Sequence, residues 1–251
     1  MKEFKKIGDQ VVPKTQGTDY ELTCDHTYEM KYDPWSEKMY LVERDPFKDQ
    51  KLYFTSEDEK FMNSVLKHAS RSDKTTGVLL CGLKGSGKTA MAKCIAKQSK
   101  LPVIIGNANV KIQRLKEFCS NIHQPVCIMF DEFEKDWDSD ETLTFLDGVQ
   151  DGCKRLVLMT CNDESDLSEF LFDRCSRIRY YREFTGLDLN IVNELIRDLY
   201  GHDDAELAEF IFNKFKVLSY DNVISFLDEL QHSDESKEDV IKFMNIALKN
   251  D

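Results

Sequence analysis

The chain has 251 residues, enough for one domain of ordinary size and a smaller subdomain. Hydrophobic residues make up 41% and charged residues 32%, a composition that excludes wholesale disorder. The formal net charge of -12 argues against a protein that coats nucleic acid non-specifically. Much of this charge lies at the carboxyl end, because residues 187–251 hold 15 acidic and 6 basic side chains.

The lengths of the apolar runs and the spacing of the cysteines indicate where in the cell the protein works. No uninterrupted apolar run approaches the ~20 residues that a membrane-spanning helix needs, so we expect no contact with a membrane. The eight cysteines are scattered among apolar runs and never form a C-x-x-C pair. This pattern favours buried, reduced thiols over metal ligands or disulfides. We therefore expect a cytoplasmic protein.

The first 50 residues predict an arm followed by a small β element. Residues 1–19 are polar and aperiodic, which is typical of a flexible arm. Residues 20–50 are richer in aromatic and aliphatic side chains and contain a turn at 33–36, so they predict an antiparallel β element. Its candidate strands lie at 20–25, 28–32 and 38–43.

Residues 51–186 predict an α/β core. Ser56 and Glu59 form a capping box for a helix that runs to about residue 70. From residue 76 onward, short apolar runs alternate with helical stretches, which is typical of buried parallel strands with crossover helices. The predicted strands lie at 78–81, 103–105, 126–130, 156–160 and 178–181.

Residues 187–251 predict an all-helical subdomain, because four helical segments follow one another with turn residues between them. The segments lie near 188–200, 204–216, 220–231 and 236–249. The fold class predicted for the chain is therefore α/β, with a parallel-sheet core, a C-terminal helical subdomain and a small N-terminal β element.

The strongest chemical signal is the run GLKGSGKT at 82–89, which fits G-x-x-x-x-G-K-[ST] between a strand and a helix. Glycines in such a P-loop let several main-chain N–H groups point inward at a helix N-terminus and bind phosphate. Lys88 is expected to reach the terminal phosphates, and the Thr89 hydroxyl to ligate Mg²⁺. The predicted nucleotide-binding residues are Tyr53, Gly82, Lys84, Gly85, Ser86, Gly87, Lys88, Thr89 and Ala90.

Two carboxylates close the apolar strand at 126–130. Asp131 and Glu132 are expected at the carboxyl edge of the sheet, beside the P-loop, where open α/β sheets bind ligands. Asp131 would hold Mg²⁺, largely through water, and Glu132 would act as general base on the attacking water. The sequence thus predicts an ATP and Mg²⁺ site.

Asn162 follows the strand predicted at 156–160, and two arginines precede the strand predicted at 178–181. Asn162 either has a catalytic role, in which it orients the lytic water or touches the γ-phosphate, or caps a turn. Arg174 and Arg177 lie in a basic loop, which is either a solvated surface or a source of guanidinium groups for a neighbouring subunit's nucleotide. The acidic stretch at 134–141 is interpreted as a solvated surface turn, with a substrate-facing loop as the alternative.

Five motifs in order resemble those of an AAA+ ATPase. They are GLKGSGKT at 82–89, CIMFDE at 127–132, LxxLDG at 143–148, MTCND at 159–163 and FDRCSRI at 172–178. The resemblance covers residues 52–251 and is greatest to the AAA clade of protein-remodelling ATPases. It implies that Arg177 is the leading arginine finger and Arg174 the second. It also implies a helical lid at 187–251.

The resemblance further implies self-assembly into a ring or helical homo-oligomer, with a hexamer as the expected form. A weaker resemblance, carried by DEFEK at 131–135 and SRIRYY at 176–181, is to the small AAA+ ATPases of tailed bacteriophages, which act in the host cytoplasm. Two features depart from the family. Residues 106–112 contain no aromatic side chain for a substrate-gripping pore loop, and the helix opening at Ser219 lacks the arginine of a second sensor.

These observations leave two functions open. The first is an oligomeric ATPase that couples ATP binding and hydrolysis to remodelling of a protein or macromolecular assembly, with an unidentified protein substrate or adaptor. The alternative is a nucleic-acid-associated, clamp-loader-like switch, which the negative charge does not favour. Its candidate basic residues are Lys2, Lys5, Lys6, Lys111, Arg114 and Lys116. A GTPase is set aside because the sequence lacks an N-K-x-D guanine-binding pattern.

Overall fold

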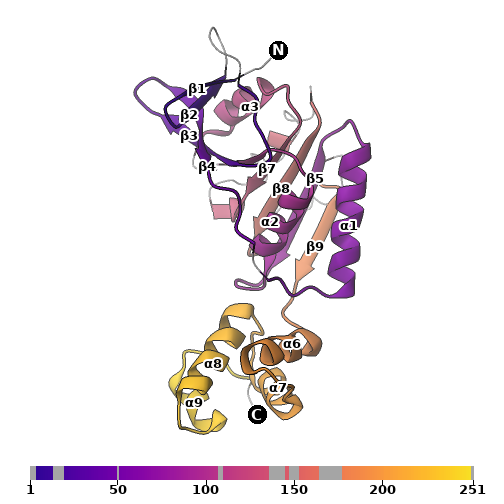
Figure 1. Ribbon diagram of the computed structural model, residues 1–251, viewed down its shortest axis with the longest axis vertical. Helices are drawn as coiled ribbons and strands as arrows, with labels where there is room; N and C mark the ends of the chain where they lie inside the picture. Colours follow the sequence, from indigo (N-terminus) through magenta and orange to yellow (C-terminus); the bar gives the residue numbers. More distant parts are fainter. Residues whose placement is uncertain are drawn as a thin grey trace.

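The computed structural model describes residues 4–13, 20–49, 51–106, 110–135, 145–146, 153–163 and 177–249. Figure 1 shows a β-sheet flanked by helices and, below it, a separate group of four helices. The strands are β1 (Phe4–Ile7), β2 (Gln10–Pro13), β3 (Thr27–Asp33), β4 (Lys38–Arg44), β5 (Thr76–Gly82), β6 (Val103–Ile105), β7 (Val126–Phe130), β8 (Arg155–Cys161) and β9 (Tyr180–Phe184). The helices are α1 (Ser56–Arg71), α2 (Lys88–Gln98), α3 (Ile112–Ser120), the short 3₁₀ helix η1 (Phe133–Lys135), α6 (Leu189–Tyr200), α7 (Ala205–Lys214), α8 (Tyr220–His232) and α9 (Lys237–Phe243).

The strands of the described residues form one sheet with the order β1-β2-β4-β3-β6-β7-β8-β5-β9. All neighbours from β3 to β9 run parallel, whereas β1, β2, β4 and β3 pair antiparallel. Every residue of β7 and of β8 is buried, which explains their continuous apolar runs. The predicted α/β fold with a parallel-sheet core is confirmed.

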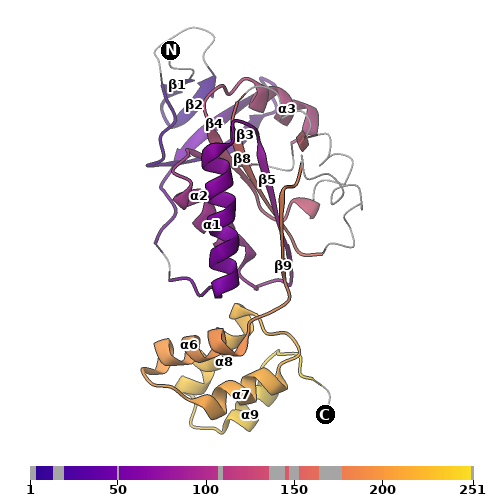
Figure 2. The same ribbon diagram turned by 90° about the vertical axis from the view of Figure 1, so that its right-hand side faces the viewer.

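Helices cover both faces of the parallel strands. Helices α1 and α2 pack on one face through a cluster that includes Val65, Ile95 and Leu158 (Figure 2). Helix α3 lies on the other face, where Leu115 joins a cluster with Ile128. No described helix has both the length and the apolar character needed to cross a membrane.

Residues 4–13, predicted as part of a flexible arm, instead form the hairpin β1–β2, and β2 pairs with β4. Val11 is fully buried in the same cluster as Leu41, so the hairpin is part of the folded sheet. The strands have four residues each, too few for alternation to be visible in the sequence. The structure thus corrects the prediction of an arm over these residues.

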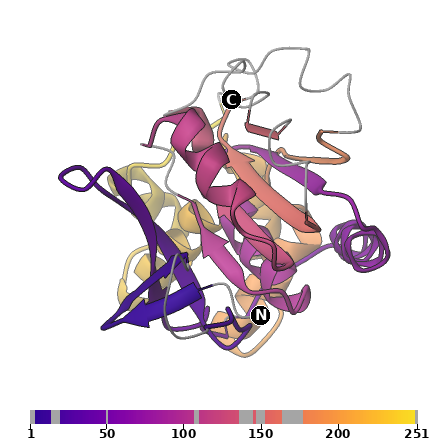
Figure 3. The same cartoon turned by 90° about the horizontal axis from the view of Figure 1, so that it is seen from above.

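The small β element predicted at 20–50 is continuous with the main sheet, because β3 pairs in parallel with β6. Seen from above, β3 and β4 form a long hairpin that projects from the body (Figure 3). The strand predicted at 20–25 is wrong. There, the side-chain amide of Gln124 donates to the main-chain oxygen of Leu22 (2.6 Å) and accepts from its N–H (3.1 Å), taking the place of a strand neighbour.

The N-cap of helix α1 lies one residue earlier in the sequence than predicted. Thr55 is the N-cap, and Asp58 completes the capping box in place of Ser56 and Glu59. Asp58 is buried and forms an ion pair with Arg182 of β9 at 2.9 Å. This tertiary contact fixes Asp58 at the start of the helix, and local sequence alone does not reveal it.

Helices α6 to α9 enclose a hydrophobic core of their own, which includes Leu195, Ile211, Phe226 and Val240. An acidic or hydroxyl side chain caps each helix, namely Asp188, Asp204, Ser219 and Ser236. Helix α9 ends at Phe243, before the predicted end near 249, because the following residues form a bridge between Phe215 and Leu248.

Gly77 gives a test of how tightly β5 and β9 pack. A Cβ at this position would overlap the main-chain oxygen of Arg177. We expect Gly77→Ala to lower the free energy of unfolding by roughly 1–3 kcal/mol, as overpacking against rigid backbone does. Urea denaturation measures this change. The exposed neighbour Asp73 is the control, since Asp73→Ala should change stability by less than about 0.5 kcal/mol. Equal stabilities of the two variants would contradict the packing described.

Candidate functional site

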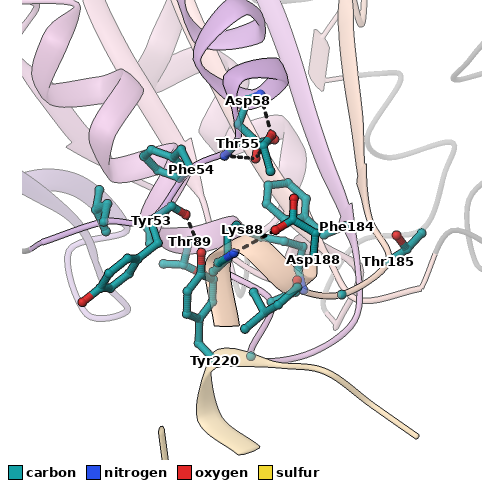
Figure 4. Close-up of a pocket in the computed structure, with 18 of the residues that line it drawn as sticks. Tyr53, Phe54, Thr55, Asp58, Lys88, Thr89, Phe184, Thr185, Asp188 and Tyr220 are labelled. Atoms are coloured by element: carbon teal, nitrogen blue, oxygen red, sulfur yellow. Dashed lines mark hydrogen bonds between the residues drawn. The ribbon is translucent and has the colours of Figure 1, made fainter. Parts of the chain in front are cut away.

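A cavity of about 770 Å³ is lined by residues from the carboxyl edge of the sheet and from the helical subdomain. Its size is in the range of small-molecule and cofactor sites. The P-loop forms one wall, and residues from the end of β9 and from α8 face it (Figure 4). All the predicted nucleotide-binding residues except Gly82 line this cavity: Tyr53, Lys84, Gly85, Ser86, Gly87, Lys88, Thr89 and Ala90. Gly82 precedes them at the end of β5.

The P-loop connects β5 to α2 and depends on its glycines. Gly82 and Gly87 have φ values of 126° and 100°, a region that strongly favours glycine. A Cβ on Gly87 would also lie 2.9 Å from the Tyr220 ring. Gly87 is the N-cap of α2, makes no side-chain cap, and is followed by a first turn without acidic residues. The first N–H groups of α2 are therefore suited to bind an anion.

Two buried polar side chains in the loop fit a phosphate group. Lys88 is buried, and its Nζ donates to the main-chain oxygens of Gly82 (2.7 Å) and Leu83 (2.8 Å). Burial lowers the pKa of Lys88. The Ser86 hydroxyl is buried and has no hydrogen-bond partner among the described residues. Phosphate oxygens would accept from both groups, so the residues present fit a nucleotide.

Asp131 and Thr89 lie together as the sequence predicts. The Thr89 hydroxyl donates to Oδ1 of Asp131 at 2.7 Å, and the Thr160 hydroxyl donates to the same oxygen at 2.6 Å. A hydroxyl and a carboxylate are oxygen donors of the kind that Mg²⁺ prefers. Among the described residues, no three His, Cys, Asp or Glu side chains form a metal-binding group. A Mg²⁺ ion held here would therefore take further ligands from phosphate and water.

Glu132 has both carboxylate oxygens engaged. Oε1 accepts a hydrogen bond from Nδ2 of Asn162 at 3.0 Å, and Oε2 forms an ion pair with Lys135. These contacts, Lys135 first and Asn162 second, lower the pKa of Glu132. An attacking water would donate to Glu132 beside these partners or in place of one of them.

Asn162 follows β8 and lies beside the predicted catalytic carboxylates, as one of its two predicted roles requires. Besides Glu132, its side chain contacts Glu134, which sequence reasoning placed in a solvated surface turn. The structure corrects that interpretation for Glu134, whose Oε2 is buried. The rest of this stretch from residue 136 to residue 141 lies outside the described residues.

Arg177 lies at the amino-terminal end of the parallel strands, whereas the P-loop of its own chain lies at their carboxyl-terminal end. Its main chain contacts Gly77 at the start of β5, whereas the P-loop follows Gly82 at the other end. At ~3.3 Å per residue, five residues of strand separate the two by about 17 Å. Arg177 is therefore too far away to serve its own nucleotide site. Arg174 lies outside the described residues.

Sequence reasoning missed Tyr220 as a residue of the site. Its N–H donates to the main-chain oxygen of Gly85 at 2.9 Å, and its hydroxyl donates to the main-chain oxygen of Tyr53 (Figure 4). Tyr53 itself packs against the core of the helical subdomain. The available signal was the opening of α8 at Ser219, where the second-sensor arginine is missing and a tyrosine follows.

Comparison with known proteins identifies the class. Residues 78–183 match the family model of the ATPase family associated with various cellular activities (AAA). The match covers the segment that holds all five motifs, and it supports the predicted resemblance of this segment to AAA+ ATPases. No curated protein matches the chain.

Solved structures support the same fold. Two variants of RuvB from Thermotoga maritima superpose with a TM-score of 0.56 at 18% and 17% identity, covering 76% and 75% of this chain and 69% and 68% of theirs. A katanin structure, titled for its self-assembly, has a TM-score of 0.52 at 17% identity and covers 77% of this chain and 71% of that one. At these identities the likeness concerns the fold alone.

The pairing of Glu132 with Lys135 predicts a titration change that needs no nucleotide. We expect Lys135→Met to raise the pKa of Glu132 toward its ordinary value, because the largest cause of its lowering is removed. Stability from this pair is present above the unfolded-state pKa and is lost as pH falls through the folded-state pKa. Carboxyl NMR titration measures the shift, with Lys111→Met as control, because Lys111 is exposed and is not among the causes of the lowered pKa. An unchanged Glu132 titration in Lys135→Met would contradict the pairing.

Proposed function

We propose that the chain works as an oligomeric ATPase that couples ATP binding and hydrolysis to remodelling of a protein or macromolecular assembly. The observation that carries this proposal is the convergence of three strand ends at one cavity. The P-loop follows β5, Asp131 and Glu132 follow β7, and Asn162 follows β8. An anion site, a carboxylate pair and an amide side by side suit hydrolysis of a nucleoside triphosphate.

Each side chain has a defined part in this reaction. The N–H groups of α2 and the Lys88 ammonium bind the phosphates, and Thr89 with Asp131 holds Mg²⁺. When bound, Mg²⁺ neutralises charge on the phosphate oxygens. Glu132 takes a proton from the attacking water, and Asn162 orients that water relative to the γ-phosphate.

The position of Arg177 supports self-assembly. Arg177 lies about 17 Å from the P-loop of its own chain, by the rise of a strand, so a role as an arginine finger would require the nucleotide of another subunit. A guanidinium in that position would neutralise developing charge on the transferring phosphoryl group. We infer a ring or helical homo-oligomer, with a hexamer as the expected form and Arg174 as a second finger.

Charge favours a protein partner over nucleic acid. The chain carries a net charge of -12, and residues 187–251 account for 15 acidic against 6 basic side chains. Such a surface repels a phosphate backbone. Stimulation of ATP hydrolysis by DNA at physiological salt would favour the alternative, a nucleic-acid loader. Affinity capture with Glu132→Gln in the presence of ATP would identify a protein substrate or adaptor.

The assigned roles predict different defects for two substitutions. Lys88→Ala should weaken ATP binding about 10- to 100-fold, the effect of losing hydrogen bonds to a charged group. Glu132→Gln should keep binding and lose about 10²- to 10⁴-fold in turnover, because only the base is removed. Nucleotide binding and phosphate release are measured separately, with Lys111→Ala as control. Equal loss of affinity in both folded variants would refute this division of roles.

The position of Arg177 predicts activity that depends on assembly. Specific activity should rise with protein concentration, and Arg177→Ala should bind ATP but lose roughly 10³-fold in turnover. Mixing Arg177→Ala with Lys88→Ala should restore activity where subunits exchange, since some interfaces then combine an intact Lys88 with an intact Arg177. Concentration-independent turnover by a monomer, with Arg177→Ala fully active, would overturn the proposal.

A further inference from the structure

The side chain of Asn162 is held between two carboxylates. Its Nδ2 donates to Oε1 of Glu132 at 3.0 Å and to Oε1 of Glu134 at 3.0 Å. A carboxylate only accepts hydrogen bonds, so the amide nitrogen must face both acids, and the amide oxygen must point away from them. Both hydrogens of Nδ2 are used, which fixes the orientation of the Asn162 side chain.

The two carboxylates are not equivalent. Glu132 also pairs with Lys135 and is the proposed general base. Glu134 instead accepts a second hydrogen bond from Asn162, from its main-chain N–H at 2.8 Å. Two of the three hydrogen bonds that fix Asn162 therefore end on one oxygen of Glu134. Its other oxygen is buried and has no hydrogen-bond partner among the described residues.

Compared with Glu132, which accepts one hydrogen bond from Asn162, Glu134 accepts two. It belongs to the single turn η1, whose first residue, Phe133, is fully buried in the core beside the sheet. Glu132, by contrast, turns toward the attacking water in the proposed reaction.

We propose that Glu134 is a positioning residue that holds Asn162 while Glu132 changes partner. When Glu132 turns to the water, one hydrogen of Nδ2 is released. Glu134 keeps the other hydrogen and the main-chain N–H, so the released N–H stays at the reaction centre, directed at the γ-phosphate or the water. This inference rests on the proposed ATPase function, in which Glu134 itself touches neither nucleotide nor water.

The contact is tested first without nucleotide. The exchange rate of the Asn162 main-chain N–H is measured by NMR in wild type, Glu134→Ala, Glu134→Gln and the exposed control Glu117→Gln. Glu134→Ala should speed this exchange about tenfold, the equivalent of one ordinary hydrogen bond. Glu134→Gln keeps an acceptor oxygen and should change it little. Unchanged protection in Glu134→Ala would overturn the proposal, whether or not the wild type hydrolyses ATP.

The positioning role is tested by a double-mutant cycle on turnover. Glu134→Ala should lower kcat about tenfold with KM nearly unchanged, and Glu134→Gln should retain most activity. In an Asn162→Ala background, Glu134→Ala should add less than about a twofold loss, because it acts only through Asn162. Losses that multiply, or a Gln variant as impaired as the Ala variant, would overturn the proposal. An inactive wild type would count against the ATPase function. The exchange rates would still test the hydrogen bond between Asn162 and Glu134.

Discussion

One carboxylate oxygen joins the three elements that make the site. Oδ1 of Asp131, at the end of β7, accepts hydrogen bonds from Thr89 of α2 and from Thr160 of β8. Thr160 in turn accepts a hydrogen bond from the N–H of Glu132 at 2.9 Å. The P-loop helix, the strand that carries the acids and the strand that carries Asn162 are thereby held at fixed separations, which a preorganised catalytic site requires.

Parallel strand register brings these groups together. Phe130 of β7 pairs with Met159 of β8, and Cys161 of β8 pairs with Cys81 of β5. The residues that follow these pairs emerge at one edge of the sheet, where the helical subdomain closes the cavity. A register shift of one residue would turn each side chain to the opposite face, so register is as important to the site as the residues themselves.

Much of the core was predictable because its signals are local. The apolar runs, the glycine spacing of the P-loop and the acids after β7 are all short patterns of adjacent residues. The errors share a different cause. Val11 is buried by a neighbouring strand, Asp58 is fixed by Arg182, and Glu134 is held by Asn162. Each of these outcomes depends on a residue that is distant in sequence.

The sequence by itself determined the resemblance to AAA+ ATPases and the residues of the candidate nucleotide site. A P-loop needs glycines and a lysine at fixed spacing, and a strand followed by Asp131 and Glu132 can be recognised without any contact map. Only the tertiary structure decided which partners each acid contacts and at which end of the parallel strands Arg177 lies. The physical reason is that a carboxylate or guanidinium acquires its role from its partners, and partners across strands are set by folding.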